Sequence, residues 1–137
     1  MTSLSPMPVI RDEGHTVPEE PRVSEACIVA ARAADAKSGE DTAILSMGEL
    51  LGVTDAFVIT SGRNVRQVRS IVDEVELRVK ALGGRPPVRV EGLDDARWVL
   101  MDYGDFLVHV FVDEARHFYD LEHLWLDAPR VEWAVPD

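Results

Sequence analysis

Residues 107–112 constrain the fold more than any other stretch, because both alternating sets of side chains are apolar apart from His109. A strand with apolar side chains on both faces needs packed layers on both sides, so it belongs at the centre of a sheet. A second apolar run, residues 98–102, is joined to it by a short turn containing Gly104. The two runs predict an antiparallel hairpin.

The clearest helix is predicted from Asn64 to the Gly83-Gly84 pair, because apolar side chains recur there at steps of three and four. A shorter helix is expected over 24–37, with Ser24 as its N-cap and Gly39 just beyond its end. Strands are predicted at 42–47, 56–60 and 88–91, with one helical turn at 48–51. This order predicts an α/β fold, a single domain whose mixed β-sheet is flanked by helices.

The two ends of the chain are expected to lie outside this domain. Residues 1–22 are rich in proline and acids and are predicted to form a disordered tail, the domain spans 23–131, and 132–137 form a C-terminal tail. No apolar run approaches the roughly 18 to 20 residues that span a bilayer, and no targeting signal is visible. We therefore expect a soluble, cytoplasmic protein without a membrane contact.

The formal net charge of −11 limits the kind of partner that the chain can bind. Binding to nucleic-acid phosphates is driven by Lys and Arg side chains that release counterions, so an acidic chain makes extended contact of that kind unfavourable. We expect little direct nucleic-acid contact and a basic protein as the partner.

The candidates for catalysis or metal binding each have a structural alternative. His109 lies near Asp102 and Asp105 in sequence, but no Ser or Cys occupies a nucleophile motif, so a hydrogen-bonded structural histidine is favoured. The single cysteine, Cys27, excludes an internal disulfide and is expected to pack as a small hydrophobic residue. Four further side chains match no recognised zinc spacing, namely Asp113, His117, Glu122 and His123. We predict no catalytic residue, no metal and no cofactor.

A strand-to-helix turn at 61–66 carries Arg63 and Arg66 at the start of the long helix. Helix N-termini bind anions and disfavour cations, so something negative is expected close to these arginines. An internal ion pair with Asp94 or Asp95 is one hypothesis, an acidic or phosphate-bearing partner is another, and a bound nucleotide is a third. A nucleotidyltransferase would also need an Asp-x-Asp or Asp-x-Glu pair for Mg²⁺, and none is found on the following strands.

Several motifs in order resemble the ribosomal silencing factor family, also called Iojap-like. The resemblance covers about residues 24–131 and rests on W-V-L-M-D-Y-G-D at 98–105, V-H-V-F at 108–111, Y-D-L-E-H-L-W at 119–125, D-A-F-V-I-T-S-G at 55–62, R-Q-V at 66–68, V-E-G-L at 90–93 and D-A-P-R-V at 127–131. The chain departs from the family at Arg63-Asn64-Val65, where small polar residues are common. That departure weakens any inherited role for this turn.

The resemblance implies a nucleotidyltransferase-like topology without catalytic motifs and a protein that is not an enzyme. It implies binding to the large-subunit ribosomal protein uL14, which would block joining of the 30S and 50S subunits and repress translation when nutrients are short. It also implies a homodimer when the protein is free. Two alternatives remain, a nucleotide-binding or nucleotidyltransferase-like enzyme and an assembly factor for the large subunit.

The expected uL14-binding residues follow from the motif positions and from the use of aromatic and acidic side chains against a basic partner. The segment 118–125 is expected to be helical, with Leu121, Leu124 and Trp125 on one face. Phe118 and Leu121 are expected to close the sheet edge. The contact residues that we predict are Trp98, Asp102, Tyr103, Asp105, Tyr119, Glu122 and Trp125.

Overall fold

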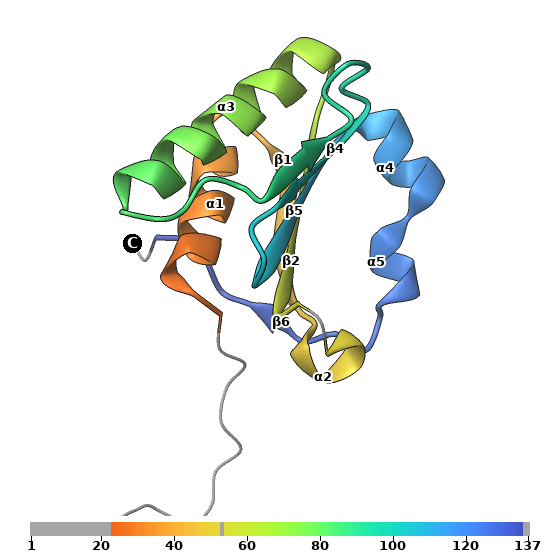
Figure 1. The fold of residues 1–137 in the computed structure, drawn as a ribbon. Helices are drawn as coiled ribbons and strands as arrows, with labels where there is room; N and C mark the ends of the chain where they lie inside the picture. Colours follow the sequence, from red (N-terminus) through yellow and green to blue (C-terminus); the bar gives the residue numbers. More distant parts are fainter. Residues whose placement is uncertain (1–22, 53, 136–137) are drawn as a thin grey trace, which may run out of the picture.

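One mixed sheet organises the chain, with its strands in the order β3-β4-β5-β2-β1-β6 (Figure 1). The computed structural model describes residues 23–52 and 54–135. Along this part of the chain the elements are α1 (Glu25–Ala36), β1 (Glu40–Ser46), α2 (Gly48–Leu51), β2 (Ala56–Gly62), α3 (Val65–Ala81), β3 (Arg89–Glu91), β4 (Trp98–Asp102), β5 (Phe106–Val112), α4 (Asp113–Tyr119), α5 (Leu121–Leu124) and β6 (Arg130–Val131). The predicted α/β domain with a mixed sheet is confirmed.

The centre of the sheet is the parallel pair β2 and β5, which stay in register from Ala56 opposite Phe106 to Gly62 opposite Val112. The other strand pairs are antiparallel. The predicted central position of residues 107–112 is confirmed, as is the hairpin of β4 with β5. The two-residue strand β6, which no sequence pattern predicted, pairs with the outer edge of β1.

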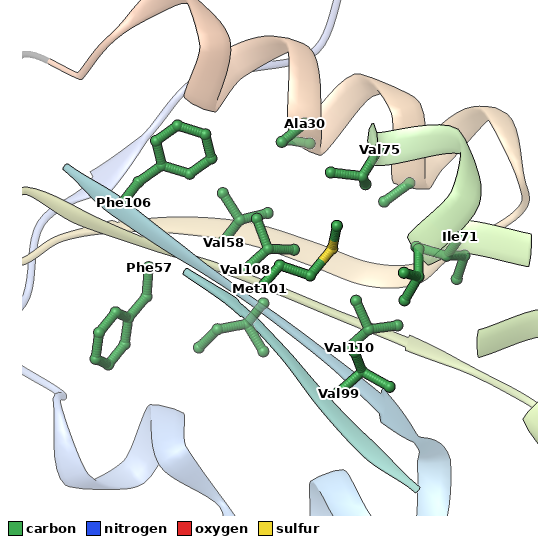
Figure 2. Packing of buried hydrophobic residues seen from close by; sticks show 14 of the residues in the cluster. Ala30, Phe57, Val58, Ile71, Val75, Val99, Met101, Phe106, Val108 and Val110 are labelled. Atoms are coloured by element: carbon green, nitrogen blue, oxygen red, sulfur yellow. The ribbon is translucent and has the colours of Figure 1, made fainter. Parts of the chain in front are cut away.

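Helices α1 and α3 cover one face of the sheet (Figure 1). Figure 2 shows Val58, Met101 and Val108 pointing toward these helices, where they meet Ile71 and Val75 of α3. The side of α1 that faces the core is made of small side chains, which let the helix lie close to the sheet and to α3. These are Cys27, Ala30, Ala31, Ala33 and Ala34, all fully buried.

Both long helices begin close to the predicted residues, and each has a side-chain cap. The Ser24 hydroxyl accepts a hydrogen bond from the Cys27 amide at 3.2 Å, and the Asn64 side-chain oxygen accepts one from the Gln67 amide at 2.8 Å. Such bonds satisfy backbone donors that the first helical turn leaves free. The helix of one turn predicted at 48–51 is also present as α2.

The opposite face of the sheet is crossed by α4 and α5, which we call the C-terminal arm (residues 113–124; Figure 1). The sequence predicted one helical segment at 118–125, whereas the helical structure starts at Asp113 and is interrupted at Asp120, whose φ of 47° is left-handed. Leu121 packs against the core, but Leu124 is 67% exposed, so the predicted shared face is wrong for Leu124. Helix α5 is a single turn that ends at Leu124, so residues 121–125 form no continuous helical face.

An aromatic layer fills the space between the sheet and the arm. Its members are Phe57, Trp98, His109, Phe111, Tyr119 and Trp125. In Figure 2 the Phe57 ring lies on the opposite side of the sheet from Phe106, toward the arm. The Trp98 ring is sandwiched between two others, with centroid separations of 5.0 Å to Phe111 and 4.7 Å to Tyr119. Offset and edge-on ring pairs of this kind add to the stability gained from burial.

His109 is the polar member of this layer and is only 5% exposed. Its Nδ1 accepts a hydrogen bond from Trp98 Nε1 at 3.1 Å, and its ring meets the Phe57 ring edge-on at 4.7 Å. Nε2 has no hydrogen-bond partner within the part of the chain that the structure describes. Burial lowers the pKa of His109 from 6.5 to about 4, so the ring is neutral near pH 7.

The packed part of the chain continues past residue 131, where the domain was expected to end. The Trp133 side chain packs against the core, and its Nε1 donates to the Thr42 carbonyl oxygen at 3.1 Å. Arg32 Nε in turn donates to the Trp133 carbonyl oxygen at 2.6 Å. The predicted N-terminal tail, residues 1–22, lies outside the described residues. None of the helices that are described is long and apolar enough to cross a membrane.

The His109 environment predicts acid sensitivity. Because the pKa is about 4 in the folded chain and near 6.5 in the unfolded one, only the unfolded chain takes up this proton as pH falls through 6.5. Stability should therefore decline between pH 6.5 and 4, by about 3 kcal/mol from this residue. Denaturant unfolding at pH 7 and pH 4 should show a smaller decline for H109Q, which keeps an acceptor for Trp98. Equal declines in the two proteins would contradict the assignment.

Gly92 predicts a second, local sensitivity at the turn between β3 and β4. Its φ is 87°, and an added Cβ would overlap the Trp98 carbonyl oxygen. Gly83 is a matched control, because its φ is 92° but an added Cβ meets open space. We expect G83A to lose about 1 kcal/mol from backbone strain alone and G92A to lose roughly 1 to 3 kcal/mol more from the overlap. Equal losses in chemical denaturation would show that the overlap is relieved at no cost.

Candidate binding surface

The arm divides its face of the sheet into two clefts of different character. The cleft beside β4 has a volume of about 460 Å³ and is lined by Trp98, Phe118 and Tyr119 among others. The cleft beside β1 and β6 has a volume of about 530 Å³ and is lined mainly by charged side chains, including Glu40, Asp113, Arg116, Glu122 and Arg130. Aromatic side chains line the first cleft, whereas the second is lined by charged side chains that connect the arm to the sheet.

Apolar side chains are exposed around the first cleft. Phe118 is 81% exposed and Tyr119 48% exposed, so the expectation that Phe118 closes the sheet edge is wrong. On the strands below, Leu100 and Leu107 are half-buried diagonal neighbours on the same face as Trp98. We call these five residues the contact face: Trp98, Leu100, Leu107, Phe118 and Tyr119. Two exposed rings beside three half-buried apolar side chains form a candidate interaction surface.

Three of the predicted contact residues lie on or near this face. Trp98 and Tyr119 belong to it, with their rings 4.7 Å apart. Trp125 is half-buried and meets the Phe57 ring edge-on at 6.5 Å, farther along the arm. Trp98 also has a structural role, because its Nε1 is already bonded to His109. Only part of its ring is therefore available to a partner.

Asp102 lies on the same side of β4 as Trp98, but its carboxylate is engaged within the chain. One oxygen accepts a hydrogen bond from the Gly104 amide at 2.8 Å, and the other lies 3.4 Å from Arg89 Nε. The first bond is the local Asp-to-backbone contact that is common at such turns. Asp102 therefore shapes the hairpin turn.

Tyr103 and Asp105 are not brought to the contact face. Tyr103 stacks on Phe106 at 4.8 Å, and Phe106 points toward the helix-covered side of the sheet (Figure 2). The Tyr103 hydroxyl is buried without a hydrogen-bond partner among the described residues, and burial raises the pKa of Tyr103 to about 12. Asp105 lies exposed in the turn, where its carbonyl oxygen accepts a hydrogen bond from the Asp55 amide at 2.8 Å. Residues that are adjacent in the motif, such as Asp102 and Tyr103, do not share a face of the sheet, because successive residues of an extended chain point to opposite sides.

Glu122 faces the charged cleft and not the contact face. Its two oxygens lie 3.0 Å from Arg116 Nε and 3.5 Å from Arg130. Burial by itself would raise the pKa of the Glu122 carboxyl, but the hydrogen bonds and positive charges of Arg116 and Arg130 outweigh it and hold the pKa below its usual range. Glu122 is therefore ionised and anchored within the chain. Arg116, its main partner, was not singled out by any sequence pattern.

The turn at 61–64 is organised by its own side chains. The Arg63 amide donates to Gln67 Oε1 at 2.7 Å, and the Gln67 side-chain nitrogen donates to the carbonyl oxygens of Lys37 and Ser38. Arg63 and Arg66 are exposed, and neither forms an ion pair within residues 23–52 and 54–135. The hypothesis of an internal ion pair with Asp94 or Asp95 is therefore wrong.

A different arginine holds the segment that contains Asp94. Arg69 donates to the carbonyl oxygens of Leu93 at 3.1 Å and Asp94 at 2.8 Å. Arg69 lies one helical turn beyond Arg66, so sequence distance alone could not separate the two. An anion contact for Arg63 and Arg66 stays a prediction.

The titratable groups outside the contact face are more consistent with structural roles than with catalysis. Burial raises the pKa of the Cys27 thiol to about 12, so it is protonated and a poor nucleophile near pH 7. A side-chain hydrogen bond with Asp113 and the negative charge of Asp113 raise the pKa of the Glu40 carboxyl at the edge of the charged cleft. Within the described part of the chain, no three His, Cys, Asp or Glu side chains are grouped to hold a metal ion.

Known proteins share both the sequence and this fold. A family model described as "Ribosomal silencing factor during starvation" matches residues 20–137. Ribosomal silencing factor RsfS of Bacillus subtilis is 43% identical over 101 residues, which cover 74% of this chain and 85% of that protein. The mouse protein named "Mitochondrial assembly of ribosomal large subunit protein 1" is 32% identical over 91 residues, covering 65% of this chain and 40% of that protein.

A solved structure gives the same result in three dimensions. The crystal structure of a protein from Chromobacterium violaceum superimposes with a TM-score of 0.71 at 30% sequence identity, covering 82% of this chain and 92% of that one. The family match includes almost the whole described sheet, the arm and the contact face. The chain therefore belongs to the ribosomal silencing factor family.

Proposed function

We propose that this protein binds ribosomal protein uL14 on the 50S subunit and thereby blocks joining of the 30S subunit. The observation that carries the proposal is the contact face, where the exposed Phe118 and Tyr119 accompany half-buried apolar side chains on a chain with a net charge of −11. Aromatic side chains serve as anchors in protein interfaces, while complementary charge raises the association rate and selects the partner. A basic ribosomal protein fits both features.

The charge also selects protein over RNA on the ribosome. An acidic chain is repelled by the phosphates that cover most of a ribosomal subunit, and it can approach closely only where a basic protein is exposed. Asp95 and Glu114 are exposed acids near Phe118, in the β3–β4 turn and on α4 respectively. They would face the basic side chains of the partner around the apolar contact.

The proposed mechanism is steric exclusion. An interface of roughly 800 Å² on each partner is enough for a specific complex, and a bound domain of this size would occupy space that the small subunit needs. No covalent bond is made or broken, which agrees with a surface built for contact. Translation would then be repressed in the cytoplasm when nutrients are limited. We also propose a homodimer for the free protein, which would have to part or leave the contact face open.

A second candidate function is assembly of the large subunit, which the name of the mouse relative favours. The same contact with the 50S subunit would serve it. Loss of the protein would then cause incomplete large subunits to accumulate during growth in rich medium. The silencing function instead predicts normal large subunits and a defect confined to starvation.

An enzyme acting on nucleotides is less well supported. The first-turn amides that a phosphate would need are partly engaged, since the Gln67 amide is bonded to Asn64 and the Arg63 amide to Gln67. Arg63 and Arg66 stay exposed as a possible anion contact. That contact would fit an acidic or phosphate-bearing partner as well as a nucleotide.

Sedimentation tests the main proposal directly. The purified protein should co-migrate with isolated 50S subunits but not with 30S subunits, and pre-incubation with 50S should reduce formation of 70S particles. The reason is that the contact face would be covered by uL14 at the surface where the subunits meet. Failure to bind 50S would overturn the proposal. Thermal stabilisation by ATP or CTP with Mg²⁺ would then bring the nucleotide-binding function forward.

Substitution of the exposed anchors should weaken 50S binding without unfolding the domain. We expect F118A and Y119A each to weaken the affinity by about tenfold or more, as for anchors at the centre of an interface. Leu77 is a matched control, because it is 63% exposed on α3, on the other side of the sheet. L77A should leave the affinity unchanged. Equal affinities for all four proteins, measured at matched melting temperatures, would show that the contact lies elsewhere.

A further inference from the structure

Arg116 connects its own helix, α4, to three other elements: α5, β1 and β2. Its Nε donates to Glu122 of α5 at 3.0 Å. One terminal nitrogen donates to the Glu40 carbonyl oxygen of β1 at 2.9 Å and to Ser61 Oγ of β2 at 3.1 Å. The other terminal nitrogen donates to the Asp41 carbonyl oxygen of β1 at 2.6 Å. The residue is only 7% exposed. A buried guanidinium in which each nitrogen has an acceptor is a built structural site and not a solvated surface charge.

The acceptors are spread widely along the chain. Glu40 and Asp41 lie at the start of β1, and Ser61 lies near the end of β2, more than fifty residues before Arg116. Glu122 lies beyond the left-handed break at Asp120, so the same guanidinium ties α5 to α4. One side chain therefore fixes both halves of the arm to the sheet.

Besides Arg116, the arm is held by apolar contacts of Ala115, Tyr119 and Leu121 with the sheet and core. Helix α5 has no buried residues, and α4 buries only Ala115 and Arg116. Arg130 also pairs with Glu122, but at 3.5 Å and from a side chain that is 62% exposed. Exposed ion pairs of that kind contribute little, whereas loss of a buried partner leaves the other polar groups unsatisfied. The position of the arm thus depends on Arg116 more than on Arg130.

We propose that Arg116 is the positioning residue of the contact face. Phe118 and Tyr119 follow it by two and three residues on the same short helix, and Tyr119 must be held over Trp98 to complete the aromatic surface. Arg116 itself is not available to a partner, because the residue is only 7% exposed and each of its nitrogens already has an acceptor within the chain. It holds the anchors in their binding arrangement before the partner arrives, which reduces the entropy lost on binding. The expected effect of Arg116 on affinity for the 50S subunit rests on the proposed function.

Amide hydrogen exchange on R116M tests the structural part. We expect the amides of the arm to exchange about tenfold faster or more, while those of α3 keep their wild-type rates, because buried hydrogen bonds of a charged group are lost only where the arm meets the sheet. R130A is the matched control, since it also removes one arginine partner of Glu122, and it should change both sets of rates by less than about threefold.

Affinity for isolated 50S subunits tests the consequence. R116M should bind about tenfold more weakly or worse, and R130A should bind as wild type does. E122Q is a milder variant that keeps the side-chain shape, and it replaces R116M in the exchange experiment if R116M fails to fold. It should then show the same increase in exchange confined to the arm. Wild-type exchange rates in the arm of R116M, or of E122Q in that case, would overturn the proposal. So would acceleration that extends equally to α3, because it would make Arg116 a general stabiliser.

The two proposals can fail separately. If the wild-type protein does not bind 50S, the proposed function fails, while the exchange comparison still decides whether Arg116 fixes the arm. If wild type binds and R116M loosens the arm but keeps full affinity, the proposed function stands and the positioning role is overturned.

Discussion

Burial of the parallel pair β2 and β5 on both faces is the constraint on which the rest of the molecule depends. Strands with apolar side chains on both sides need two covering layers. The first is complete, because the alanine-rich side of α1 lets that helix lie close beside α3 over the sheet. The second consists of the narrow arm and cannot cover the whole face (Figure 1). Trp98, Leu100 and Leu107 are left half-buried beside it, so the strand residues of the contact face are the part of the sheet that the second layer leaves open.

The two layers are stabilised in different ways. The layer under α1 and α3 is aliphatic and depends on close packing (Figure 2). The layer under the arm combines stacked rings with two buried polar groups, His109 and Arg116. His109 is accommodated by remaining neutral with one hydrogen bond, whereas Arg116 keeps its charge and is compensated by Glu122 and three further oxygen acceptors. Polar groups of this kind define one arrangement, because displacing them leaves donors without acceptors.

The candidate site was only partly predictable. Trp98 and Tyr119, two of the expected contact residues, lie together with their rings 4.7 Å apart. Tyr103 was placed with them only by its neighbouring position in the motif, and in the folded chain it stacks on Phe106 on the other side of the sheet. Phe118 was expected to be covered, yet it is 81% exposed. Exposure depends on which elements lie above a residue, and the alternation of residues along a segment carries no information about that.

The sequence by itself determined the α/β class, the central strand, the helix cap at Ser24, the start of the long helix near Asn64, the net charge and the family motifs. These follow from local periodicity, from side chains that bond within a few residues, and from composition. Only the tertiary structure decided which arginine is buried, where the arm bends and which aromatics remain exposed. Arg116 meets acceptors on β1 and β2 that lie 55 to 76 residues away in the chain. A pairing over that distance is set by how the sheet orders its strands, and no local pattern records it.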